Sequence, residues 1–129
     1  MRFTLEFAES ELRELVRDGG SARLRLAAAA VRDEAGERGW LASVICSVTP
    51  ASVRGDTAQA FGRIAEAGLR HDQRLLRRMD VPGTLAAARQ GEVVSLAVRL
   101  ANGAQFVVEG HALEAILADD VRFTPDLSC

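Results

Sequence analysis

The sequence predicts an α+β fold that is predominantly antiparallel β, a sandwich or partly open barrel built from three hairpins and one N-terminal helix. Apolar and polar residues alternate at 22–31 and again at 40–49, as they do in strands with one buried face. Asn102-Gly103 lies between two apolar runs, and this dipeptide is a strong hairpin signal. One stretch near the N-terminus has helical rather than alternating spacing.

That stretch, about residues 10–18, is expected to form the helix, after a short strand over residues 2–7. Ser10 is a good N-cap residue, and Asp18-Gly19-Gly20 would end the helix. The apolar residues between them stand at i, i+3 and i+4 positions: Leu12, Leu15 and Val16. Because this apolar stripe is narrow, the helix is expected to lie on a sheet.

The first hairpin is expected to join 22–31 and 40–49 around the polar loop 32–39. Alternation along its second strand places four side chains on one face: Trp40, Val44, Cys46 and Val48. Residues 50–60 are expected to form a loop.

Residues 57–80 have two interpretations. A single helix would bring several apolar side chains to one side, but Gly62 and Gly68 would each cost about 1 kcal/mol in its interior. Four arginines would also repel one another along its flank. A hairpin that turns at residues 70–73 avoids both costs, and we favour it.

The third hairpin is expected over residues 93–110. A two-residue type I′ turn at Asn102-Gly103 would place Val98 opposite Val107. One face then carries Val94, Leu96, Val98, Leu100 and Val107, and the other carries Val93, Ala97, Phe106 and Val108, with Arg99 among them. Because both faces are largely apolar, something must cover the second one. A partner or second copy would make Val93, Ala97, Phe106 and Val108 interface residues, whereas the N-terminal helix would cover them within one chain.

The C-terminal segment is less distinctive. Residues 111–118 have a helical composition, but they follow the strand pattern of the preceding residues, and we favour a strand. Pro125 makes the end of the chain extended.

Length and composition limit the classes of function. The 129 residues fit one domain over 1–129, long enough to bury a core. The net charge of −2 gives no general attraction to nucleic acid or to an anionic membrane. Without an apolar run long enough to span a bilayer, or a signal-peptide pattern, we expect a cytoplasmic protein. All sixteen basic residues are arginine, the bias of a GC-rich and therefore bacterial coding sequence.

Several polar groups are candidate sites. His71-Asp72 could be a catalytic pair, but adjacent strand residues point to opposite faces, so a solvated turn is the better interpretation. Cys46 is expected in the core and Cys129 at the surface. Asp33-Glu34 and Asp119-Asp120 are acidic pairs in expected loops. No spacing typical of a metal site or a phosphate-binding loop occurs, so no cofactor or metal is predicted.

The remaining candidate is an arginine cluster that could bind an anion: Arg70, Arg74, Arg77 and Arg78. Nucleic-acid surfaces usually add aromatic stacking platforms, and we assign Trp40 and Phe61 to the core. Nucleic-acid binding is therefore disfavoured.

The sequence best fits a small, non-enzymatic bacterial protein-interaction domain, either an adaptor or immunity-type partner binder or a homo-oligomer. An Arg-rich protein that binds anions or nucleic acid is the first alternative. A small hydrolase or transferase using His71 or His111 is the second.

Overall fold

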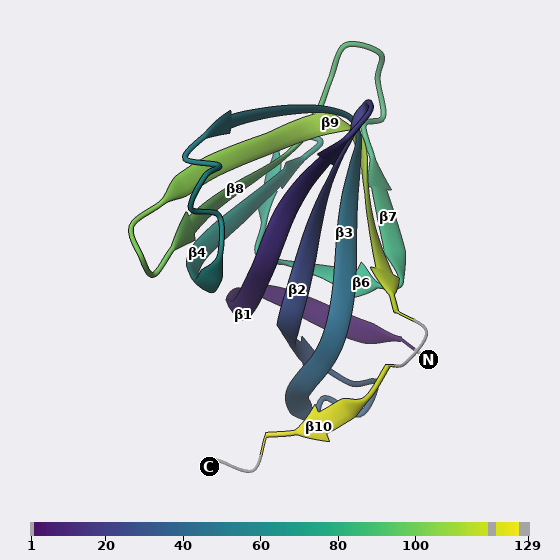
Figure 1. Ribbon diagram of the computed structural model, residues 1–129. Coiled ribbons are helices and arrows are strands. Elements are labelled where there is room, and N and C mark those ends of the chain that lie inside the picture. The colour runs from purple at the N-terminus through teal and green to yellow at the C-terminus, as the bar shows by residue number, and fades with distance from the viewer. Residues whose placement is uncertain (1, 119–120, 127–129) are drawn as a thin grey trace.

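The computed structural model describes residues 2–118 and 121–126, and its regular elements within these residues are all strands. In chain order they are β1 (Phe3–Asp18), β2 (Ser21–Arg32), β3 (Arg38–Gly55), β4 (Gly62–His71), β5 (Arg74–Leu76), β6 (Arg78–Val81), β7 (Gly83–Ala86), β8 (Val94–Leu100), β9 (Gln105–Leu117) and β10 (Phe123–Pro125). Figure 1 shows how they wrap around one another.

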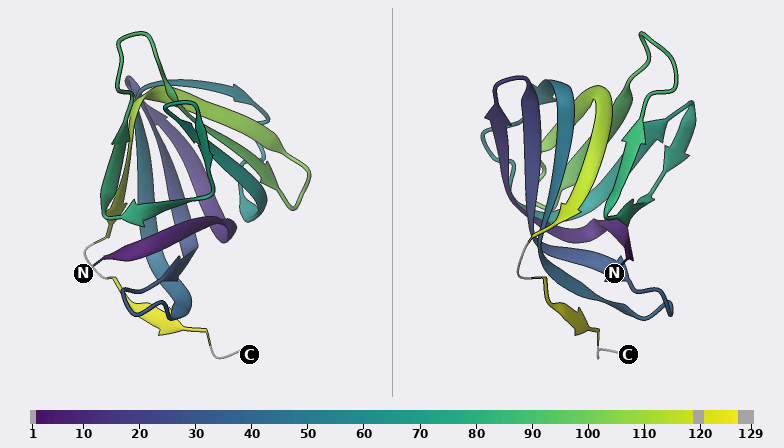
Figure 2. Two further views of the ribbon diagram at one scale, coloured as in Figure 1. Left: turned by 180° about the vertical axis from the view of Figure 1, so that it is seen from behind. Right: turned by 90° about the vertical axis from the view of Figure 1, so that its right-hand side faces the viewer.

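Six of the strands form a closed antiparallel barrel. Their order is β3-β2-β1-β4-β8-β9, and pairing of β9 with β3 closes the ring. The four short strands attach to its edges: β5 to β4, β6 to β1, β7 to β9 and β10 to β3. In Figure 2 the β2–β3 hairpin lies on one side of the molecule and the green strands β6 and β7 lie on the other, and the N-terminal part of β1 crosses between them to pair with β6. The predicted α+β class is therefore wrong, because the elements of the described residues are all strands. The β-barrel part of the prediction matches, but the barrel is closed rather than partly open.

The core fills the space inside this barrel. Its largest fully buried side chains are Leu5, Phe7, Leu12, Leu24, Leu26, Leu41, Ile64, Leu69, Leu96, Leu100, Phe106 and Leu113. Every strand of the closed ring contributes to this core, as expected when each buries one face.

The predicted N-terminal helix at 10–18 is wrong, because these residues continue β1. Asp18 pairs with Ser21, so Gly19-Gly20 is the two-residue turn of a hairpin with β2 rather than a helix end. Gly19 has a φ of 60°, which suits the first position of a type II′ turn. A bulge interrupts the ladder between Glu6 and Glu11, and it shifts the buried positions along the strand.

Ser10 stabilises this bulge instead of capping a helix. Its hydroxyl donates a hydrogen bond of 2.7 Å to the carbonyl oxygen of Glu6 and accepts one of 2.9 Å from the N–H of Ala30. These bonds replace ladder bonds that the bulge removes, which explains a fully buried serine.

The hairpin of 22–31 with 40–49 is confirmed as β2 and β3, but two details differ. β3 continues through Gly55, so much of the expected loop at 50–60 is strand. Ser43 has a φ of 63°, and the buried face changes there, so that Leu41 lies in the core and Trp40 is only half-buried.

Residues 57–80 form a hairpin, as favoured over the long helix. β4 and β5 are joined by Asp72 and Gln73, whose φ angles of 50° and 65° fit a type I′ turn. Phe61 precedes β4 and is 54% exposed, so its assignment to the core is wrong. The strand favoured for 111–118 is confirmed, as a continuation of β9.

The turn at Asn102-Gly103 joins β8 and β9, but the loop is one residue longer than predicted. The N–H of Leu100 donates a hydrogen bond of 2.9 Å to the carbonyl oxygen of Ala104, and Val98 pairs with Phe106. A shift of one residue turns every side chain of β9 to the other face. Phe106 and Val108 therefore lie in the core, 2% and 0% exposed, and Val107 faces outward.

Candidate functional site

A groove on the outer face of the sheet is the candidate site. Four outward-facing residues form a row across β4, β8, β9 and the end of β3: Gly68 pairs with Ala97, Ala97 with Val107, and Val107 with Arg54. Three of the four side chains are small or absent, and they make an apolar floor. We call this floor and its walls the sheet groove.

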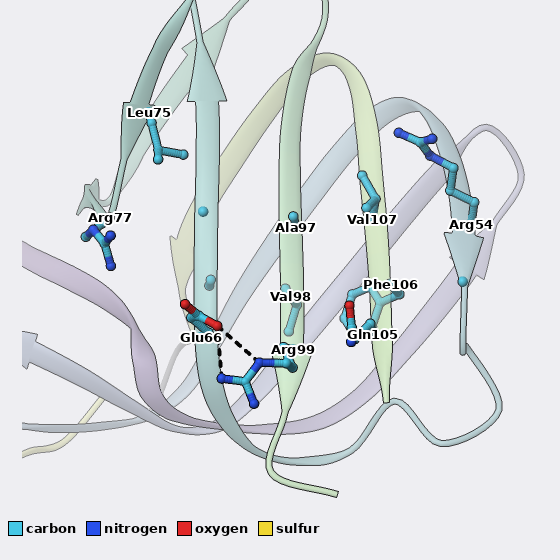
Figure 3. A pocket seen from close by; sticks show the side chains of 13 residues that line it. Arg54, Glu66, Leu75, Arg77, Ala97, Val98, Arg99, Gln105, Phe106 and Val107 are labelled. Atoms are coloured by element: carbon cyan, nitrogen blue, oxygen red, sulfur yellow. Dashed lines mark hydrogen bonds and ion pairs between the residues drawn. The ribbon is translucent and has the colours of Figure 1, made fainter. Parts of the chain in front are cut away.

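The β4–β5 hairpin forms one wall of the sheet groove. Leu75 extends over β4, and its Cδ1 lies 3.0 Å from the position that a Cβ would take on Gly68. Glycine at position 68 thus leaves room for Leu75 to approach. Arg77 continues the same wall, and Arg54 of β3 stands on the opposite side (Figure 3).

Between these walls lies a hollow of about 610 Å³. Its polar side chains are Arg54, Glu66, Arg77, Arg99 and Gln105. Glu66 accepts two hydrogen bonds from Arg99, of 3.1 Å from Nε and 2.9 Å from Nη2 (Figure 3). Arg77 forms no ion pair with any residue that the structure describes. The hollow therefore combines an apolar floor with a surplus of positive charge.

A second hollow, of about 750 Å³, continues the sheet groove toward the loop before β8. It shares Arg54, Gly68, Leu75, Ala97 and Val107 with the first hollow. Its remaining charged side chains are Arg70, Asp72, Glu92 and Glu109, and the imidazole of His71 lies beside them. Val93, 49% exposed, lies at this end. The far end of the groove is thus more acidic than the end at Arg77 and Arg99.

The four predicted interface residues are divided between the groove and the core. Val93 and Ala97 line the sheet groove, whereas Phe106 and Val108 are buried in the barrel. Sequence reasoning missed Val107 and Leu75, which face the groove. A three-residue loop at the Asn-Gly turn would have placed Val107 correctly, but no comparable signal identifies Leu75.

The arginine cluster is also divided. Arg70 and Arg77 line the two hollows of the sheet groove, while Arg74 and Arg78 are exposed and line neither hollow. Within the described part of the chain none of the four forms an ion pair, and this leaves their guanidinium groups open to an external anion.

His71 and Asp72 meet, contrary to the expectation that they would point apart. Asp72 adopts a positive φ in the turn, and its Oδ2 lies 3.4 Å from Nε2 of His71. The same nitrogen lies 2.7 Å from the carbonyl oxygen of Ala86. A catalytic triad needs the carboxylate and the nucleophile on different ring nitrogens. The arrangement instead ties the turn to the end of β7.

Other groups needed for catalysis are not assembled around this histidine. Ser95 lines the same hollow, but it pairs with Arg70 and no hydrogen bond joins it to His71 in the described residues. His111 is exposed on β9, while Cys46 is fully buried. Among the described residues, no hydrogen bond joins either histidine to a serine, threonine or cysteine side chain.

The predicted acidic pairs provide no cation site in the described residues. Oδ1 of Asp33 accepts hydrogen bonds of 2.9 Å and 2.8 Å from the N–H groups of Ala35 and Glu37, so it stabilises the β2–β3 turn. Glu34 accepts one from the N–H of Arg2. No cluster of metal-binding side chains occurs over 2–118 and 121–126. Asp119-Asp120 and Cys129 lie outside the described residues.

Cys46 lies in the core as predicted, and burial raises the pKa of its thiol to about 12. In a Cys129→Ser variant, we expect the remaining thiol to be silent toward Ellman's reagent at pH 8 and to react fully in urea. Because its pKa is higher in the folded state, stability should be lost as the pH rises from 9.0 toward about 12. Rapid reaction of the folded protein would contradict this placement.

Comparisons with known proteins add no functional information. No family model, curated protein or solved structure matches the chain significantly. Within the described residues no helix is long and apolar enough to cross a membrane. The function must therefore be argued from the groove itself.

Proposed function

We propose that the protein is a non-enzymatic interaction domain that binds a partner protein in the sheet groove. The observation that carries the proposal is the position of two of the four large apolar side chains that are exposed among the described residues. Leu75 is 55% exposed and Val93 is 49% exposed, and both line a groove whose floor is itself apolar. Contiguous apolar surface of this kind typically marks a contact site on a protein surface.

The charges of the groove favour a different protein over a second copy. A twofold interface brings the same patch of two subunits together. A twofold axis that passes through the first hollow would place Arg54, Arg77 and Arg99 of the two subunits close together, and Glu66 is the one acidic side chain among the described residues that line this hollow. Like charges facing each other oppose association. A heterologous partner avoids this repulsion.

Anion binding is the second candidate, because Arg70 and Arg77 of the groove have no ion-pair partner in the described residues. Nucleic acid fits less well than a protein, since none of the described residues places an exposed aromatic side chain in either hollow and Phe106 is only 2% exposed. We expect any affinity for single- or double-stranded DNA to be weaker than about 10⁻⁶ M at physiological salt.

A short, uncharged aliphatic diazirine amino acid at position 97 tests the proposed function in cells that naturally express the chain, because it is smaller than arginine and leaves most of the hollow of about 610 Å³ open. Ala97 is exposed in the groove. Ala27, an equally small and exposed residue, lies in β2 on the opposite side of the barrel from β8. We expect irradiation to give a discrete adduct with a second protein from position 97 and none from position 27. The partner can be identified by mass spectrometry of the adduct.

Three outcomes would contradict the proposal. An adduct of twice the chain's mass would identify a second copy as the occupant. Equal adducts from positions 97 and 27 would show nonspecific contact. The absence of any adduct from position 97 would leave the groove without a protein partner.

A further inference from the structure

We infer that the sheet groove accepts an extended peptide segment that carries acidic side chains at one end and an aliphatic side chain at its centre. This inference rests on the proposed function and specifies the class of partner. The acidic end is assigned to Arg77 and Arg99, and the aliphatic side chain to the floor at Ala97 and Val107, beside Arg54.

The charge of the first hollow indicates an acidic ligand. Three arginines and one glutamate line it, whereas the whole chain has sixteen basic and eighteen acidic residues. Glu66 is already bound to Arg99, and Arg54 makes only a 3.6 Å contact with Glu109. The side chain of Arg54 is 67% exposed. The guanidinium groups of Arg54 and Arg77 are therefore available to carboxylates.

The apolar floor between these arginines favours a bound segment with an apolar side chain at its centre. Gly68 and Ala97 are too small to fill the space that Leu75 and Val107 border. An aliphatic side chain placed there would cover the exposed face of Leu75 and displace water from the floor. A segment with acidic side chains alone would leave the apolar floor in contact with water.

The length of the groove favours an extended conformation. Its two hollows reach from Arg99, near the end of β8, to Val93, which directly precedes β8. These two residues are six positions apart in the sequence. At about 3.3 Å per residue, that separation is about 20 Å. A strand-like segment of about six or seven residues covers the same distance.

The two ends of the groove also set a direction. The second hollow adds one arginine, Arg70, and three carboxylates to its lining: Asp72, Glu92 and Glu109. Carboxylates of a ligand would therefore bind less favourably there than at Arg77 and Arg99. The acidic residues of the segment must therefore bind at the Arg77 end, with neutral or basic residues toward Val93.

Selection from a phage-displayed library of random twelve-residue peptides tests this inference. The library is first depleted on an Ala97→Arg variant, which fills the floor at an exposed position, and then selected on the unaltered protein. We expect the recovered peptides to have Asp or Glu on one side of a Leu, Ile or Val. Thermal unfolding of the variant confirms that the depletion step used folded protein.

Charge reversal on one recovered synthetic peptide gives the quantitative test. We expect Arg77→Glu to weaken its binding at least about tenfold, measured by fluorescence anisotropy. Arg17→Glu is the matched control, since Arg17 is exposed on β1, away from the groove, and forms no ion pair with described residues. A peptide with the reversed sequence should bind more weakly than the original.

Other results would overturn the inference. Recovered peptides without an acidic bias would overturn it, and so would a selection that recovers no peptide. Equal binding of the synthetic peptide by the Arg77→Glu and Arg17→Glu variants would overturn it as well. If position 97 still crosslinks to a partner protein, such a result would reject only the acidic, extended ligand. If position 97 crosslinks to nothing, the proposed function fails as well.

Discussion

Replacing Phe106 with alanine is expected to lower the free energy of unfolding by about 3–5 kcal/mol. Phe106 is 2% exposed and is one of the largest side chains in the barrel core. Its backbone is also closely packed, because a Cβ on Gly55 of the neighbouring strand would lie 2.8 Å from the Cα of Phe106. The neighbours therefore cannot easily collapse into the space that the ring leaves.

Urea denaturation followed by circular dichroism measures this loss. Val93→Ala is the control, since Val93 is 49% exposed beside the same hairpin and should change stability by no more than about 0.5 kcal/mol. If Phe106→Ala cost less than about 1 kcal/mol, the ring would lie outside the core. The two-residue turn would then be correct, and the outer face of β9 would have to be assigned again.

The position of Phe106 shows which features of the 93–110 hairpin can be predicted from the local sequence and which cannot. The Asn102-Gly103 signal locates the turn, and alternation in β8 correctly assigns Val94, Leu96, Val98 and Leu100 to the core. The same signal does not distinguish a loop of two residues from one of three. That single residue decides which face of β9 is buried.

The incorrect helix has a comparable cause. Leu12, Leu15 and Val16 fit helical spacing, but a bulge in a strand produces the same spacing when the buried face changes along it. The bulge is stabilised by the distant Ala30, through Ser10, so no local pattern could reveal it. Hydrogen bonding with β2 overrides a weak helical preference.

The candidate site was predictable only in part for the same reason. Val93 and Ala97 lie before the turn, where alternation alone fixes the face. Leu75 reaches the groove only because β5 pairs with residues 69–71 of β4, which brings the Leu75 side chain over Gly68. The sheet groove exists because β5 folds back onto β4. The sequence therefore predicts a floor residue such as Ala97 but not a wall residue such as Leu75.

Replacing Gly110 with alanine is expected to cost about 3 kcal/mol, at the upper end of the cost of overpacking. Gly110 lies midway along β9, where this strand passes from its pairing with β8 to its pairing with β7. A Cβ there would clash with the carbonyl oxygen of Pro50 and lie 2.6 Å from Cγ1 of Val48. Because a backbone atom is involved, a change of rotamer cannot relieve the contact.

Gly20→Ala is the matched control for this experiment. Neither glycine has a positive φ, and a Cβ on Gly20 would have nothing within 4 Å, so we expect a change within about 0.5 kcal/mol. Urea denaturation of both variants separates the steric contact from the general effect of removing a glycine. If Gly110→Ala were as stable as Gly20→Ala, β3 and β9 would not approach as closely as the structure shows. The pairing of Arg54 with Val107 depends on this close approach of β3 and β9. A different register between the two strands would then place different side chains on the floor of the sheet groove.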